Sequence, residues 1–103
     1  MLYIIETTTA TKKEAKFLSQ LLIAKKLVAC AQIQKIESAY LWKGQMQEKK
    51  EFLLSFKSTK EHIATIKKLL AQNHSYEVCE IIAFKPDYTS KEYGEWVEKS
   101  VKS

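Results

Sequence analysis

The segment His74–Ile82 holds more side chains capable of chemistry than any other stretch of this 103-residue chain. An imidazole, a phenol, a thiol and two carboxylates precede an apolar run, on His74, Tyr76, Cys79, Glu77 and Glu80. Imidazole and thiolate groups suit copper and zinc, whereas carboxylates alone favour harder cations. Polar groups this dense at the start of a buried strand belong either to a solvated loop or to a site. The segment therefore predicts a binding site if the fold gathers these groups.

A second thiol, Cys30, completes the set of candidate metal ligands, which is Cys30, His74, Glu77, Glu80 and Cys79. The spacing matches no local metal motif, because there is no CxxC pair and no pair of histidines four residues apart. A site must therefore assemble through the fold or between subunits. Structural alternatives stay open: Cys30 and Cys79 as small packed residues, and His74 as the end of a helix. We expect His62 to lie at the surface.

Composition predicts one folded domain spanning residues 1–103. Hydrophobic residues make up 46% of the chain, with only two glycines and one proline, which argues against linkers and disorder. No apolar run approaches the roughly 18 residues of a membrane span, and the start lacks a basic leader-like region. We expect a cytoplasmic protein with free thiols and no membrane partner.

The net charge of +5 invites a nucleic-acid interpretation, which the residue types weaken. All 17 basic residues are lysine, so the planar arginine fork that reads phosphates and guanine edges is absent. The lysines are dispersed, often as pairs at expected helix ends or at the hairpin. We therefore interpret them as solvated surface and expect no nucleic-acid partner.

Three similar sequences predict the starts of three helices. Each places a hydroxyl residue three positions before a glutamate, the pattern of a capping box, at Thr11–Glu14, Ser58–Glu61 and Thr89–Glu92. Apolar residues at helical spacing follow each of them. Strands are predicted at Leu2–Thr8, Val28–Trp42, Met46–Lys57 and Cys79–Phe84, with a hairpin turn at Lys43-Gly44. The predicted order is β-α-β-β-α-β-α.

This order predicts an α+β fold, a ferredoxin-like βαββαβ sandwich with a long β-hairpin and an extra C-terminal helix. A fifteen-residue strand spans about 50 Å, against a radius of gyration of about 13 Å, so the hairpin should project. The apolar residues change parity along its first strand, which predicts a bulge near Gln34-Lys35. A projecting apolar hairpin favours subunit contact, and we expect a homo-oligomer.

Three segments give the chain a resemblance to the CutA divalent-cation tolerance protein family over essentially its full length. Leu27–Ile33 is similar to the family strand L-A-A-C-x-x-I, and Tyr40–Gly44, followed by Glu51, is similar to the hairpin Y-x-W-x-G and its acid. His74–Ile81 resembles H-P-Y-E-V-P-E-I, with Ser75 and Cys79 where proline is usual. Three motifs in this order are far more specific than one.

The resemblance implies a homotrimer for copper and other divalent-metal tolerance, with no settled enzymatic reaction attached to the fold, and we expect no enzyme. Its hairpins and C-terminal helices would join the subunits and leave clefts between them. A divalent metal, Cu or Zn, is the implied cofactor. The expected cleft or interface residues are Trp42, Glu51, Lys57 and Tyr76, with Trp42 packed between subunits and a carboxylate paired with Lys57.

Two alternatives remain on the same fold. A PII-like trimeric signalling module would bind a small molecule in its intersubunit clefts, although the chain offers no glycine-rich phosphate loop. An acylphosphatase-like enzyme would require a basic phosphate cradle and an activated nucleophile, and neither is visible. Fold analogy by itself decides neither case.

Overall fold

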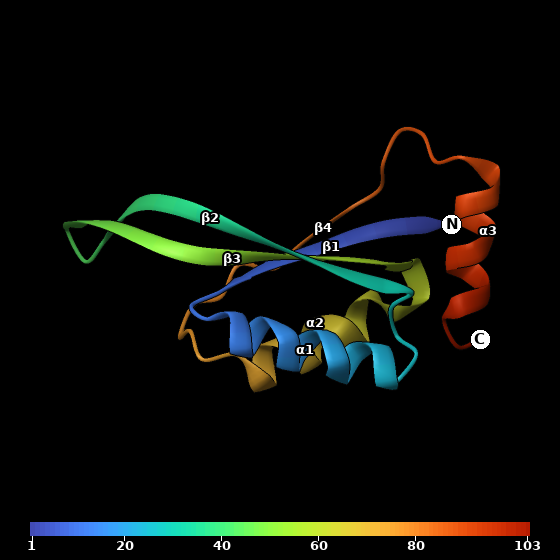
Figure 1. The fold of residues 1–103 in the computed structure, drawn as a ribbon, viewed down its shortest axis with the longest axis horizontal. Helices are drawn as coiled ribbons and strands as arrows, with labels where there is room; N and C mark the ends of the chain where they lie inside the picture. Colours follow the sequence, from blue (N-terminus) through green and yellow to red (C-terminus); the bar gives the residue numbers. More distant parts are fainter.

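The computed structural model describes residues 1–103, which form an elongated molecule of 45 × 26 × 21 Å (Figure 1). Its elements follow the predicted order. They are β1 (Leu2–Thr9), α1 (Lys12–Ala24), β2 (Cys30–Trp42), β3 (Gln45–Thr59), a 3₁₀ turn (Lys60–His62), α2 (Ile63–Asn73), β4 (Ile82–Phe84) and α3 (Lys91–Ser100). None of the helices is both long and apolar enough to cross a lipid bilayer.

The four strands form one sheet in the order β2-β3-β1-β4, with every neighbouring pair antiparallel. Helices α1 and α2 lie side by side on one face of the sheet, and α3 packs at the end of the sheet that carries the chain termini (Figure 1). The β2–β3 hairpin projects from the opposite end. The α+β class and the long hairpin expected from the sequence are therefore both present.

The hydrophobic core lies between the sheet and helices α1 and α2. Strand residues contribute alternate side chains, as the period of two requires, and helix residues contribute one apolar stripe each. The fully buried members, at most 2% exposed, are Ile5, Ala15, Leu18, Leu22, Leu27, Val28, Leu54, Phe56, Ile66 and Leu70. This packing fixes which face of β1 and β3 points away from the helices.

Strands β2 and β3 stay in one register from Cys30, opposite Lys57, to Trp42, opposite Gln45. The predicted bulge near Gln34-Lys35 is therefore absent, and that prediction is wrong. The parity of the apolar residues changes because the covering layer changes: Ile33 lies over the helices, whereas Ile36, half-buried, lies on the other face, opposite Glu51. We call residues 38–49, the part of the hairpin beyond this point, the arm.

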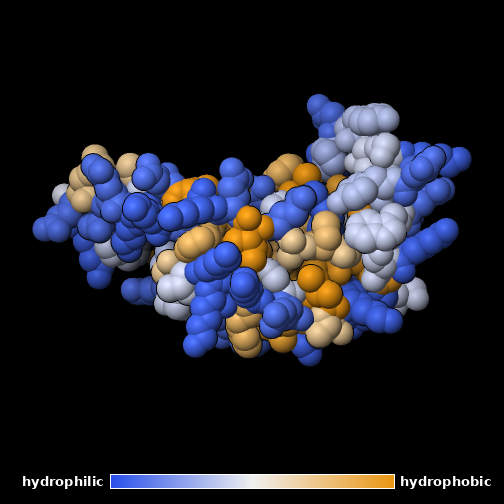
Figure 2. Space-filling model, viewed as in Figure 1, coloured by the Kyte–Doolittle hydropathy of each residue, from blue (hydrophilic) through white to orange (hydrophobic).

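The arm ends in a two-residue turn at Lys43-Gly44, where the sequence predicted it. Both residues have positive φ, 51° and 80°, as a type I′ hairpin turn requires. Hydrophilic side chains dominate the arm, whereas hydrophobic ones gather over the base of the sheet and the helices (Figure 2). The arm is therefore built without a core of its own.

Only the first of the three predicted capping boxes holds its helix by the predicted bond. The backbone N–H of Glu14 donates to Thr11 Oγ1 at 3.1 Å. Ser58 instead donates its hydroxyl to the carbonyl of Leu27 at 2.5 Å, and a 3₁₀ turn separates it from α2. Helix α3 begins after Ser90, not Thr89, and has no side-chain cap. The helices exist as expected, but a tertiary contact occupies the second predicted cap, and the third is not formed.

His62 is buried, which makes its expected surface position wrong. Its side chain ends the 3₁₀ turn, and Nε2 lies 2.7 Å from the carbonyl oxygen of Lys102. Because a carbonyl oxygen only accepts, Nε2 carries the proton and donates. The N–H of Lys102 in turn donates to the carbonyl of Lys26 at 2.9 Å. The chain after α3 is thus attached to both loops beneath it.

Candidate functional site

The polar segment 74–81 connects α2 to β4 by crossing an edge of the sheet. Strand β4 pairs only with Ile4–Glu6 of β1, so the edge of β1 is open beyond Glu6. His74 meets Thr7 on the face covered by the helices. Tyr76 reaches Glu51, which alternates with core-facing neighbours and so belongs to the opposite face. Because the segment turns across the edge, β4 begins at Ile82 rather than at the predicted Cys79.

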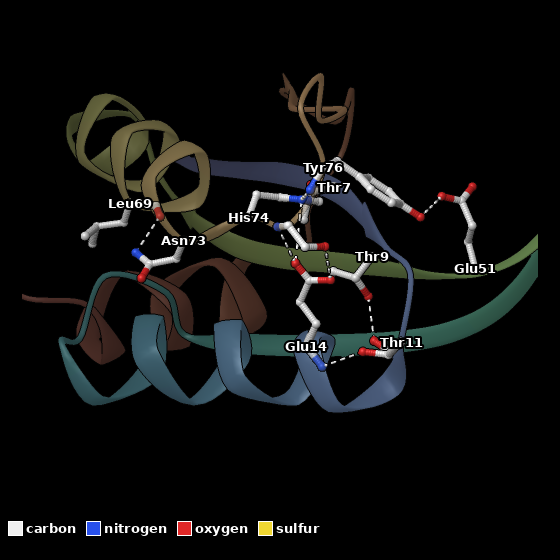
Figure 3. A network of polar contacts seen from close by, with 10 residues as sticks. Thr7, Thr9, Thr11, Glu14, Glu51, Leu69, Asn73, His74 and Tyr76 are labelled. Carbon is white, nitrogen blue, oxygen red and sulfur yellow. Dashed lines mark hydrogen bonds and ion pairs between the residues drawn. The ribbon is translucent and has the colours of Figure 1, made fainter. Parts of the chain in front are cut away.

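His74 is held by the chain on both ring nitrogens, and its side chain is fully buried. Nε2 lies 3.2 Å from Thr7 Oγ1, and Nδ1 accepts the backbone N–H of Tyr76 at 3.2 Å (Figure 3). An acceptor Nδ1 places the proton of the neutral ring on Nε2, which then donates to Thr7. Within one chain, His74 therefore positions the segment, and neither nitrogen is free to bind a metal.

Glu14, in the first turn of α1, fixes the next residue of the segment. One carboxylate oxygen accepts the N–H of Ser75 at 2.8 Å, and the other accepts its hydroxyl at 2.9 Å. Proline, which the resemblance places at this position, offers neither donor. Sequence reasoning treated Glu14 only as part of a cap. The departure from the family pattern at Ser75 was the one signal of this contact.

Tyr76 and Glu51 form the polar pair at the centre of the site. The Tyr76 hydroxyl donates to Glu51 Oε2 at 2.6 Å, and Glu51 is only 5% exposed (Figure 3). Burial, followed by the hydrogen bond to the Glu51 carboxylate and its negative charge, raises the pKa of Tyr76 well above its ordinary value near 10. The phenol therefore stays protonated and serves as a fixed donor that holds its ring in place.

A cleft of about 550 Å³ lies between the arm and the segment that follows His74. Its volume falls in the range of small-molecule sites. It is lined from the strands by Thr8, Ser38, Ala39, Tyr40, Trp42, Gln47, Lys49 and Glu51, and from the segment by Ser75, Tyr76, Glu77, Val78 and Glu80. One cleft is thus lined by Trp42, Glu51, Tyr76, Glu77 and Glu80, five of the residues that the sequence analysis named.

The other candidate metal ligands do not join them. Cys30, at the start of β2, is level with Lys57 of β3 and Ile4 of β1. Ile4 and Thr7, the partner of His74, are three residues apart on β1, which is about 10 Å at the rise of a strand. Cys79 is half-buried and does not line the cleft. No three His, Cys, Asp or Glu side chains of the chain are grouped closely enough to hold a metal ion. A single chain therefore does not fit a metal.

Lys57 also lies away from the cleft. Its ammonium donates to Gln32 Oε1 at 2.6 Å, a neighbour across the β2–β3 ladder. The pairing that we expected with a cleft carboxylate is not made within the chain. Cys30 has a different partner, because its sulfur lies 3.5 Å from the hydroxyl of Tyr93 on α3. Burial and then this hydrogen bond raise the pKa of Tyr93 to about 12.

Fold and cleft together define a small α+β protein with a preformed, ligand-sized cleft beside a projecting hairpin. Residues 3–100 match the family model described as CutA1 divalent ion tolerance protein. The chain belongs to this family.

Relatives and solved structures agree over the whole chain. The divalent-cation tolerance protein CutA of Thermotoga maritima is 31% identical over 95% of this chain and 97% of its own length. The human Protein CutA is 31% identical over 93% of this chain, which spans about half, 54%, of the human protein. The periplasmic divalent cation tolerance protein CutA of Archaeoglobus fulgidus aligns with a TM-score of 0.95, 29% identity, and coverage of 99% of this chain and 100% of that one. CutA from Synechococcus elongatus aligns with a TM-score of 0.94 and 32% identity, over 98% of this chain and 90% of that one.

Proposed function

We propose that this chain acts in tolerance of divalent cations, copper foremost, as a cytoplasmic homotrimer of ferredoxin-like subunits without catalytic activity. Family membership supports the tolerance role. In the proposed trimer, the arm of one subunit packs on the next, and clefts lie between neighbours. The observation that carries the proposal is the placement of exposed apolar side chains in two separate regions of each chain.

The first region is the tip of the arm, where Leu41 and Met46 are 68% and 65% exposed and Trp42 is 40% exposed. The second is the free edge of the sheet at β4, where Ile82 and Phe84 are also exposed. Two different patches on separate parts of a molecule favour head-to-tail contacts, which close into a ring when the rotation allows it. A β4 edge with unpaired backbone groups favours pairing in the same way.

A metal site in this assembly requires donors from more than one subunit. Cys30, Cys79, Glu77 and Glu80 have the right chemistry, and each is at least partly accessible. His74 is the weakest candidate, because binding through it would break its bond to Thr7 or to the backbone of Tyr76. We therefore propose the two thiols, rather than the imidazole, as the ligands to test first.

A PII-like small-molecule module is the second candidate, and the volume of the cleft favours it. The lining charges argue against a phosphorylated ligand, since three carboxylates, on Glu51, Glu77 and Glu80, face a single lysine, Lys49. A nucleotide would bring further negative charge into this site. If the protein signals, its ligand is therefore not expected to be a nucleotide.

Light scattering combined with titration calorimetry tests the proposal. The reduced protein should have the mass of a trimer and bind Zn(II), and Cu(I) under anaerobic conditions, with submicromolar affinity. C30S and C79S are matched variants, and at least one of them should weaken binding tenfold or more. A monomer at micromolar concentration would contradict the trimer. Weak binding that neither substitution changes would contradict a direct metal site.

A further inference from the structure

The cleft carries a charge opposite to that of the rest of the chain. Its lining includes Glu51, Glu77 and Glu80 against Lys49, a net charge of −2, whereas the chain as a whole has +5. A concave site lined by one sign of charge concentrates ligands of the other sign. The local field therefore selects for cations, against the average of the surface.

A cation already lies over the aromatic rings of this cleft. The ammonium of Lys49 is 5.9 Å from the ring centroid of Tyr40 and 5.8 Å from that of Tyr76. Both distances are within the range of cation–π attraction, which is electrostatic and does not depend on what carries the charge. Two rings from distant parts of the chain thus hold one ammonium group between the arm and the segment after His74.

The ring of Tyr76 is positioned before any ligand arrives. Tyr76 is held through its hydroxyl by the buried carboxylate of Glu51 at 2.6 Å and through its backbone N–H by His74. Tyr40 lies on β2, opposite Gln47 of β3. Lys49 differs from Tyr76, because its flexible side chain is exposed and can swing toward water. A ligand can therefore displace the lysine while the ring of Tyr76 stays in place.

We propose that the cleft binds a small organic cation, whose ammonium group replaces that of Lys49 beside Tyr40 and Tyr76. The carboxylates of Glu77 and Glu80, exposed at the rim, favour its approach. A divalent metal fits this place less well, because it requires several close ligand atoms and the chain groups no three such side chains. This inference rests on the proposed function only because both concern the same cleft. It adds the class of ligand that the cleft binds.

Lys49 then competes with the ligand for the two rings, so removal of its charge should tighten binding rather than weaken it. Removing its charge by K49Q should free the rings and tighten the binding of an organic cation about two- to fivefold. Lys50 is the matched control, because it is the next residue but points to the opposite face of β3. K50Q removes the same charge without freeing the rings, so it should change the binding affinity by less than half as much as K49Q does.

Titration calorimetry on the full chain can use choline as the probe and 3,3-dimethylbutan-1-ol, its uncharged analogue of the same shape, as the control. Choline should bind at least tenfold more tightly than the alcohol. Y40L should weaken choline binding about two- to fivefold. Light scattering and Zn(II) titration of the same samples report the proposed function separately.

Equal binding of choline and the alcohol would overturn the inference, because the site would then recognise shape and not charge. Equal effects of K49Q and K50Q would overturn the competitor role of Lys49. A trimer that binds zinc but shows either result would leave the proposed function intact. A protein that binds choline as described but neither assembles nor binds metal would support the inference and refute the proposed function.

Discussion

Strands β2 and β3 pass through two environments in a single register. At the base of the hairpin, Leu54 and Phe56 are fully buried beneath the helices. In the arm, Leu41 and Met46 are more than 60% exposed. The backbone ladder is the same in both regions, so the difference lies only in what covers the side chains. Backbone pairing and the type I′ turn extend the ladder, whereas burial decides where the ladder contributes to stability.

The base should therefore respond most strongly to loss of a side chain. Phe56→Ala removes a fully buried ring from the core and should lower the free energy of unfolding by about 3–5 kcal/mol. Phe17→Ala is the matched control, since that ring is 52% exposed on α1 and should change stability by less than about 0.5 kcal/mol. Urea denaturation at constant protein concentration measures both. Similar losses for the two variants would contradict the assignment of the core.

The junction between base and arm depends on the bond between Tyr76 and Glu51. Tyr76→Phe keeps the ring but leaves the buried carboxylate without its donor, which should cost about 1–3 kcal/mol. Tyr88→Phe is the control, because Tyr88 is 82% exposed. A denaturation series in which both substitutions cost the same would show that the Tyr76 bond contributes nothing.

The same pair predicts a pH dependence. The pKa of Tyr76 is higher in the folded than in the unfolded state, so its contribution to stability is complete below pH 10 and declines as the pH rises toward the folded-state value. Wild-type stability should therefore fall above about pH 10, and Tyr76→Phe should make that fall shallower. Unfolding curves measured between pH 8 and 11 test this. Parallel curves for the two proteins would contradict it.

The arm itself should respond to its turn. Gly44→Ala places a side chain at a φ of +80° with open space around it, so the cost is conformational, about 1 kcal/mol. Hydrogen exchange should quicken at arm amides and stay unchanged between β1 and β3. Gly94→Ala, within α3 and with ordinary contacts, should instead stabilise by up to about 1 kcal/mol. Faster exchange throughout the sheet in Gly44→Ala would show that arm and base unfold together.

The smallest effect on the single chain is expected at Trp42, which is 40% exposed in the arm. Trp42→Ala should change the unfolding free energy of the dissociated chain by less than about 0.5 kcal/mol. It should nevertheless weaken assembly and lower the melting temperature of the oligomer, since its ring is proposed to pack between subunits. Light scattering over a dilution series measures the first effect and calorimetry the second. An unchanged oligomer with the same melting temperature would remove Trp42 from the interface.

Local signals in the sequence are sufficient to predict the helices, the hairpin turn and the projecting arm. Apolar spacing indicated each helix, Lys43-Gly44 located the turn, and the length of the strands indicated the projecting arm. Thr11 caps α1 as predicted, because both partners lie within one helical turn. Ser58 fails as a cap because its hydroxyl is taken by Leu27, 31 residues away. Motifs whose partners are adjacent in sequence can be recognised, but competition from distant groups cannot.

The candidate site was predictable in composition but not in geometry. The sequence points to Trp42, Glu51 and Tyr76 as cleft or interface residues. No local pattern, however, shows that the phenol of Tyr76 reaches a carboxylate 25 residues earlier. The role of His74 in fixing the segment depends on Thr7, which is 67 residues away. The parity change in β2 predicts a bulge because a bulge and a change of the apolar face in an unbroken strand leave the same pattern in the sequence.

The unbroken register of the hairpin has a consequence for how the core forms. Pairing that starts at Lys43-Gly44 is local and can proceed residue by residue toward the base, before the distant strands β1 and β4 join. The turn then decides which residues of β3 meet the helices, although it lies far from them. A slip of one residue there would turn Leu54 and Phe56 to the wrong face. During folding, the solvent-exposed tip of the molecule thus sets the alignment of its interior.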